Sequence, residues 1–118
     1  MDDDALAVLR REFDAEEGSF LLGLRGRLEW DRDAFRRLER AMRAACVRQQ
    51  GREVFERWLA EGFYEVSHFV PDWTGHPNFP RPQPREYYED CLERVADLAD
   101  WFFRGEHAYQ EPHEWPEL

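Results

Sequence analysis

Residues 31–48 read DRDAFRRLERAMRAACVR and carry the clearest helical pattern in the chain. Asp31 stands before the pattern, and aspartate is one of the residues that cap a helix N-terminus. Apolar residues recur three and four positions apart, which gathers on one helix face Phe35, Leu38, Met42 and Ala45. The opposite face carries Arg32, Arg36, Arg40 and Arg43. The sequence therefore predicts an amphipathic helix that ends at Gln49-Gln50-Gly51.

Two shorter elements are predicted on the N-terminal side of this helix. A first helix follows the acidic run Asp2 to Asp4, with Gly18 as its C-terminal stop and one apolar face made of Leu6, Leu9 and Phe13. Residues 19–30 fit both periodicities: their apolar positions alternate as in a strand and also lie on one side of a helix. We favour a helix, because no other stretch alternates cleanly enough to pair with a lone strand.

On the C-terminal side, the apolar spacing from Glu53 indicates another helix, which Gly62 either kinks or divides in two. A last long helix is predicted from Arg85 to Arg104, and Gly105 ends it. Its inward positions are Tyr88, Cys91, Leu92, Val95, Ala99 and Phe102. We therefore predict an all-α fold, a small helical bundle of four to six helices that forms a single domain over residues 1–118.

Two segments are predicted to be irregular. Residues 71–84 contain five of the seven prolines, so no helix is expected there. Because Trp73 and Phe79 supply apolar anchors, we expect this proline-rich segment to be an ordered strap packed over the helices. Residues 106–118 are expected to form an extended C-terminal arm, which lies on the body of the protein or on another subunit.

The composition excludes several classes of protein. The chain has 118 residues, with 16 arginines and no lysine against 26 acidic residues, which gives a net charge of −10. This charge repels a phosphate backbone, so no nucleic acid partner is expected. The longest apolar run, residues 20–24, is too short to span a bilayer, and the acidic N-terminus does not resemble a secretory leader. We expect a cytoplasmic protein without a membrane partner and with reduced cysteines.

The negative charge is concentrated near the C-terminus, where residues 86–118 have a net charge of −8. Six carboxylates of the last predicted helix fall on one stripe opposite its apolar face, and we call them the acidic row: Glu86, Glu89, Asp90, Glu93, Asp97 and Asp100. Arg94 and Arg104 are the expected counter-charges within that helix. The acidic row is either a solvated face paired with the arginines of residues 32–43 or a docking surface for a basic protein partner.

Candidate metal ligands occur on the helix predicted after residue 53. Glu65 and His68 form a Glu-x-x-His pair of the kind used by di-metal carboxylate bundles, on the same helix side as Glu61. The pair has no second copy, and the other histidines match no zinc spacing: His76, His107 and His113. We therefore assign no metal and no other cofactor.

Candidate nucleophiles are equally weak. Ser19 and Ser67 do not lie in a nucleophile elbow, and Cys46 and Cys91 fall on inward helix faces, where thiols are usually inert. No catalytic residue is assigned.

A small polar pocket is a further candidate, built on the strap from Asp72, Trp73 and His76. The alternative interpretation is that Asp72 begins an Asx-turn and Trp73 belongs to the core.

Two stretches also carry a resemblance to a family, namely Phe69-Val70-Pro71-Asp72-Trp73-Thr74-Gly75-His76-Pro77 and the segment from Tyr87-Tyr88 to Trp101-Phe102-Phe103-Arg104-Gly105-Glu106. There the chain resembles small acidic proteins of high-GC bacteria that carry no assigned activity. The resemblance implies a cytoplasmic, stand-alone domain and supplies no catalytic residues.

We therefore expect a non-enzymatic protein-binding module that recognises a basic protein partner through the acidic row. Small acidic helical immunity proteins, which neutralise basic toxins, are an analogy of charge and size alone. One alternative is a homodimer or larger assembly held by Trp101, Phe103, Tyr109 and Trp115. A second alternative is a metal-dependent enzyme that uses Glu65, His68 and His76.

Overall fold

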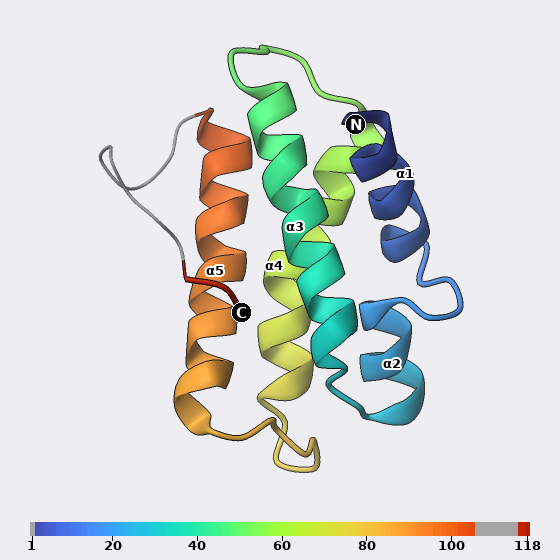
Figure 1. The fold of residues 1–118 in the computed structure, drawn as a ribbon, viewed down its shortest axis with the longest axis vertical. Coiled ribbons are helices and arrows are strands. Elements are labelled where there is room, and N and C mark those ends of the chain that lie inside the picture. Colours follow the sequence, from blue (N-terminus) through green and yellow to red (C-terminus); the bar gives the residue numbers. More distant parts are fainter. Residues whose placement is uncertain (1, 106–115) are drawn as a thin grey trace.

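A computed structural model describes residues 2–105 and 116–118, and within these residues the chain forms five helices and no strand (Figure 1). The helices are α1 (Asp2–Phe13), α2 (Phe20–Arg27), α3 (Arg32–Gln49), α4 (Arg57–Thr74) and α5 (Arg85–Arg104). The predicted all-α bundle of four to six helices is confirmed.

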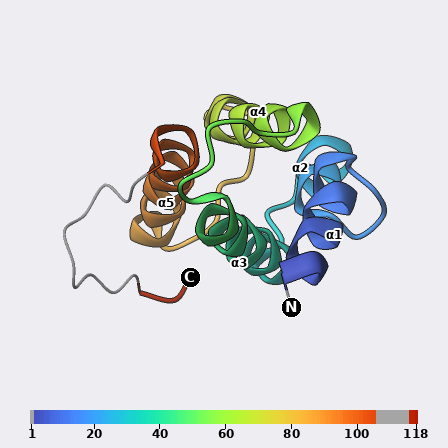
Figure 2. The ribbon, with the colours of Figure 1, turned by 90° about the horizontal axis from the view of Figure 1, so that it is seen from above.

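The helices are arranged around one interior. α3 packs between α1 and α5, while α4 packs against α5, α1 and α2 (Figures 1 and 2). Seen from above, α4 lies across the bundle from α3, and α5 and the α1–α2 pair close the two remaining sides (Figure 2). This arrangement makes α4 and α5 neighbours along their length, which matters for the site described below.

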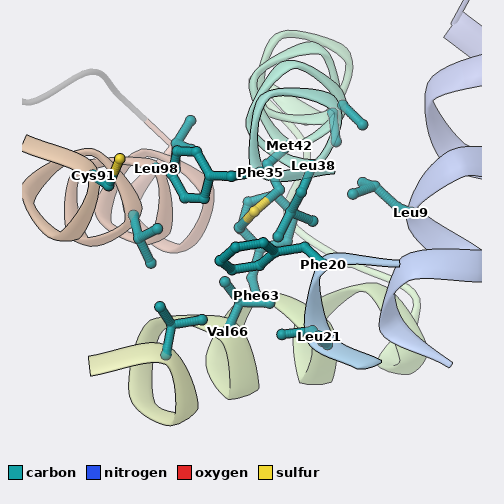
Figure 3. Packing of buried hydrophobic residues seen from close by; sticks show 14 of the residues in the cluster. Leu9, Phe20, Leu21, Phe35, Leu38, Met42, Phe63, Val66, Cys91 and Leu98 are labelled. Carbon is teal, nitrogen blue, oxygen red and sulfur yellow. The ribbon is translucent and has the colours of Figure 1, made fainter. Parts of the chain in front are cut away.

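The core forms where the apolar stripe of α3 meets the other helices (Figure 3). Phe35, Leu38 and Met42 are almost completely buried, as the helical periodicity predicts. Phe63 of α4 stacks on Phe102 of α5 with ring centroids 4.1 Å apart, and this contact joins the two helices at their inner faces. Each such side chain contributes roughly 1.5–3 kcal/mol when it is removed from water.

The N-terminal helices differ in one respect from the prediction. α1 ends at Phe13 rather than at Gly18, because Ala15 takes a positive φ of 54° and breaks the helical path. The interpretation of residues 19–30 as helical is confirmed by α2. The Ser19 side chain caps it by accepting a hydrogen bond from the Leu22 amide at 3.2 Å, and the buried Glu12 carboxylate accepts the Phe20 amide at 2.9 Å.

Two expectations for α4, its start and its end, are wrong, and of the two alternatives at Gly62 the division into two helices is excluded. The helix begins at Arg57 instead of Glu53, it passes through Gly62 without a break, and it continues past Pro71 to Thr74. Pro71 removes one backbone donor, but only one further turn follows it, and that turn is held by other bonds. Gly75 donates its amide to the Pro71 carbonyl at 2.9 Å, and the Thr74 hydroxyl lies 2.7 Å from the Val70 carbonyl.

Residues 75–84 are therefore what remains of the expected strap. Phe79 is buried, and Trp73 at the end of α4 is half-buried with its indole donating to the Leu24 carbonyl at 2.7 Å. Within the strap, the Arg81 side chain donates to the Thr74 carbonyl at 3.1 Å and to the His76 carbonyl at 3.3 Å. The Trp73 bond joins α4 to α2, and the Arg81 bond to Thr74 fixes the strap against the end of α4.

A buried ion pair joins α3 to α5. Glu39 and Arg94 have side chains 3% and 5% exposed, and Arg94 Nη1 donates to Glu39 Oε2 at 3.1 Å. Arg43, one turn along α3, adds a second guanidinium to the same carboxylate, with Nη2 to Oε2 at 2.6 Å. A buried carboxylate needs such partners, because an unpaired charge in the interior is strongly destabilising.

The end of the chain lies on the same two helices. Arg94 Nη2 donates to the Pro116 carbonyl at 2.7 Å, Arg36 donates to the main-chain oxygen of Leu118 at 3.3 Å, and Arg40 pairs with Glu117. Of the expected C-terminal arm, residues 106–115 lie outside the described residues. None of the helices in the described ranges is both long enough and apolar enough to span a membrane.

We expect Gly62→Ala to lower the free energy of unfolding by about 1–3 kcal/mol, because a Cβ on Gly62 would lie 2.0 Å from the Phe13 ring. Helix propensity alone predicts the opposite sign, a gain of up to about 1 kcal/mol. Urea unfolding of the two proteins measures the difference.

Gly26→Ala is the matched control, because its new methyl group would lie 3.6 Å from Leu22 Cδ1, an ordinary contact. This variant should be as stable as the parent or more stable. If both variants gain stability alike, the close approach of α1 to α4 is refuted.

Candidate functional site

The acidic row lies on the outer side of α5. Five of its members are exposed and Asp97 is half-buried, because the opposite side of the helix is packed into the core. Arg85 pairs with Glu89 at 2.9 Å, and Glu93 and Asp97 also take part in interactions within the molecule. Glu86, Asp90 and Asp100 make no ion pair with another described residue.

Arg94, one of the two expected counter-charges, is buried and donates to Glu39 on α3, a position that the helical periodicity alone does not distinguish. Three of the six carboxylates, Glu86, Asp90 and Asp100, form no ion pair with a described residue, so half of the acidic row keeps its negative charge. Like charges three and four residues apart cost roughly 0.2–0.5 kcal/mol per pair, so a cation that met this face would be bound favourably.

A groove of about 1210 Å³ runs between α4 and α5, and we call it the acidic groove. Three small residues, Ala60, Ala96 and Ala99, line it together with the aromatic residues Phe69, Tyr64 and Phe103. Tyr64 and Phe103 keep 49% and 47% of their surface exposed. The polar part of the lining consists of four carboxylates together with Ser67 and His68. The carboxylates are Glu61, Glu65, Asp72 and Asp100. Small apolar residues with a carboxylate rim suit a polypeptide that is apolar on one side and basic on the other.

Only Asp100 of the acidic row lines the acidic groove. The Glu61, Glu65 and His68 side of α4 was visible in the sequence, but its proximity to α5 was not, because periodicity does not say which helices are neighbours. The exposure of Tyr64 was not predicted, whereas Phe103 was expected on an assembly surface and is exposed. An excess of aromatic residues beyond the predicted core stripes was the available signal.

The four carboxylates of the acidic groove differ in whether they form an ion pair within the molecule. Glu65 pairs with Arg25 at 3.4 Å, and the Arg25 guanidinium lies 4.6 Å from the centroid of the Phe69 ring. Glu61, Asp72 and Asp100 form no ion pair with any residue that the structure describes. The groove therefore has three carboxylates that an incoming cation can approach without displacing an arginine.

The Glu-x-x-His pair does not converge on one point. His68 Nδ1 lies 2.8 Å from the Tyr64 carbonyl and its ring is in edge contact with the Tyr64 ring, while Glu65 is engaged by Arg25. His76 lines a different cavity. Among the described residues, no group of three histidine, cysteine or acidic side chains is arranged to hold a metal ion. His107 and His113 lie outside the described residues.

The three residues singled out for a polar pocket line one cavity. Asp72, Trp73 and His76 border a pocket of about 420 Å³ beneath the strap, which we call the strap pocket. Its other lining residues are Leu28, Phe69, Asn78 and Phe79. Asp72 begins no turn of its own, since it lies in the last helical turn of α4. Asp72 and Phe69 line both the acidic groove and the strap pocket.

The candidate nucleophiles are engaged in structural roles. Ser19 caps α2, and the Ser67 hydroxyl donates to the Tyr64 carbonyl at 2.8 Å. Cys46 and Cys91 are free thiols in the core, and burial raises the pKa of each thiol to about 12.

We expect both cysteines of the folded protein to resist iodoacetamide at pH 8, because their raised pKa keeps them protonated and burial excludes the reagent. Both should react once the chain is denatured. The same shift lowers the free energy of unfolding above pH 9, where the unfolded chain loses thiol protons that the folded chain retains up to about pH 12. Mass spectrometry measures how much of each cysteine is labelled in the folded and in the denatured protein. Rapid labelling of either cysteine in the folded protein would contradict the packing of α3 or α5.

No family model matches the chain, and no curated protein or solved structure is significantly similar to it. Functional inference for this protein therefore rests on its acidic groove, its strap pocket and the chemistry of their side chains.

Proposed function

We propose that the protein is a non-enzymatic binding module that docks a basic, amphipathic helix of another protein in the acidic groove. The observation that carries the proposal is that Glu61, Asp72 and Asp100 form no ion pair with a described residue and surround a surface of small and aromatic residues. This pattern complements a helix with apolar residues on one side and arginine or lysine on the other.

The alanines and the aromatic rings of the groove both favour a helix as the occupant. Alanines at positions 60, 96 and 99 let a second helix axis approach closely, because the distance between packed helices is set by the side chains at the contact. The half-exposed rings of Tyr64 and Phe103 provide apolar area that a partner would cover. Hydrophobic burial would supply the affinity and the carboxylates would orient the helix.

The acidic row extends the same charge along the outer side of α5. Glu86 and Asp90 lie towards its N-terminal end, and together with Asp100 they produce a negative field around the groove. Such a field accelerates encounter with a cationic protein and repels an anionic one. We propose that this binding takes place in the cytoplasm, where the free thiols of Cys46 and Cys91 would stay reduced.

A second copy of the chain fits the groove less well. Of the aromatic residues expected to hold a homodimer, Phe103 is exposed in the groove and Trp101 is half-buried with an interaction of its own. Tyr109 and Trp115 lie outside the described residues. Two copies meeting at this surface would bring two sets of carboxylates together, and the repulsion opposes association.

The test uses a fluorescein-labelled peptide of about 18 residues, long enough to follow the groove as a helix, with alanine and leucine on one face and arginine on the other. We expect the Glu61→Gln/Asp100→Asn protein to bind it between about 2-fold and 30-fold more weakly than the parent, because each exposed ion pair contributes roughly 0.2–1 kcal/mol. Fluorescence anisotropy at low and high salt measures both affinity and its salt dependence.

The matched control is Asp14→Asn/Glu17→Gln, which changes the net charge equally but at two exposed residues between α1 and α2. It should bind almost as the parent does. A permuted peptide of the same composition, without an apolar face, should bind more weakly than the amphipathic one. The proposal fails if the control weakens binding as much as the groove variant, or if the permuted peptide binds equally well.

A further inference from the structure

The strap pocket has walls that are already in place. Phe69 and Trp73 stack with ring centroids 5.4 Å apart and planes 23° from parallel, so one wall is a rigid aromatic surface. Phe79 on the strap is buried, and its amide donates to the His76 carbonyl at 3.0 Å. The volume of about 420 Å³ falls within the range of small-molecule sites. A single ring with a short side chain is the size of ligand that such a pocket admits.

Leu28 forms the remaining apolar wall in an unusual way. It occupies the C-cap of α2 with φ 52° and ψ 46°, the left-handed conformation that favours glycine. A leucine held there normally gains by burial, yet 44% of its surface is exposed. An apolar ligand in the strap pocket would cover this side chain. The backbone cost at Leu28 is therefore consistent with a binding role.

The polar groups of the pocket define the charge of the ligand. Asp72 has no ion pair with any described residue, so its carboxylate attracts a cation. His76 Nδ1 accepts the Asn78 amide at 3.2 Å, which leaves Nε2 as the protonated nitrogen of the neutral ring and hence a donor. An ammonium close to both Asp72 and Trp73 would gain from the carboxylate and from the Trp73 ring, because the Phe69 ring is already in contact with the Arg25 guanidinium, 4.6 Å from its centroid.

We propose that the strap pocket binds small aryl-alkyl amines, with the aromatic ring against Leu28, Trp73 and Phe79 and the ammonium beside Asp72. The ring matches the apolar walls, and the positive charge matches the one carboxylate that lines the pocket. The inference does not require the acidic groove to have a protein partner.

The test is a nuclear magnetic resonance titration of the whole protein with three ligands of one shape, namely phenethylamine, 2-phenylethanol and phenylacetate. We expect phenethylamine to shift the Trp73 indole and the strap amides with a Kd of about 1 mM, as suits so small a ligand. The neutral alcohol should bind more weakly and the anion most weakly. The Trp73 signal is assigned by its loss in Trp73→Phe.

Two variants separate the contributions of the Asp72 carboxylate and of the Leu28 wall to ligand binding. Asp72→Asn should reduce the affinity for phenethylamine between about 1.4-fold and 5-fold, to that of the alcohol, while leaving alcohol binding unchanged, because only the ion pair is lost. Leu28→Gly should raise Tm by relieving the positive φ and should weaken all three ligands by removing a wall. The matched control Asp90→Asn, on the outer side of α5, should bind as the parent does.

The proposal is overturned if phenethylamine produces no saturable shift at the Trp73 indole, or if Asp72→Asn weakens the amine and the alcohol equally. It is also overturned if Asp90→Asn reduces amine binding as much as Asp72→Asn, because the amine would then be attracted by net charge alone.

Discussion

Glu39 is buried between α3 and α5, and its carboxylate is held by Arg94 from the opposite helix and by Arg43 from its own. A carboxylate in the interior is tolerated only with such partners, so this contact restricts how the two helices pack. The second amino group of Arg94 reaches the Pro116 carbonyl, so one guanidinium also fixes the end of the chain. The register of α5 against α3 depends on this cluster.

The same cluster explains the distribution of charge. Arg43 and Arg94 are used inside the molecule, and Arg36 and Arg40 are engaged by Glu117 and the end of the chain. Because α5 keeps its register, Asp100 lies beside α4 and completes the lining of the acidic groove. The position of Asp100 in the acidic groove thus depends on the packing of α5.

The sequence predicted those features that follow from local periodicity. The buried stripe of α3, the helical character of residues 20–27 and the burial of Tyr88, Cys91 and Phe102 all follow from apolar spacing. Periodicity does not predict contacts between segments that are distant in the sequence. Gly62, which is expected from the sequence to kink the helix or divide it, is the place where Phe13 of α1 packs closely. Arg94, which is expected to be a counter-charge within α5, is buried against Glu39 of α3.

Of the two candidate sites, the strap pocket could be predicted from the sequence and the acidic groove could not. Asp72, Trp73 and His76 are near in sequence, so their common pocket could be proposed from local spacing. The acidic groove needed the pairing of α4 with α5, which no residue pattern reveals, since the polar side of a helix looks alike whether it faces solvent or a groove. The strap also begins later than expected, because bonds around Thr74 and Gly75 compensate for Pro71.

A double-mutant cycle at Glu39 and Arg94 tests the central claim most directly. The free energy of unfolding is measured for the parent, Glu39→Gln, Arg94→Met and the double variant. The account predicts that each single variant loses about 3 kcal/mol or more, and that the double variant loses at least about 1.5 kcal/mol less than the two losses combined. Losses that add within about 0.5 kcal/mol would contradict the role of this ion pair in joining α3 to α5.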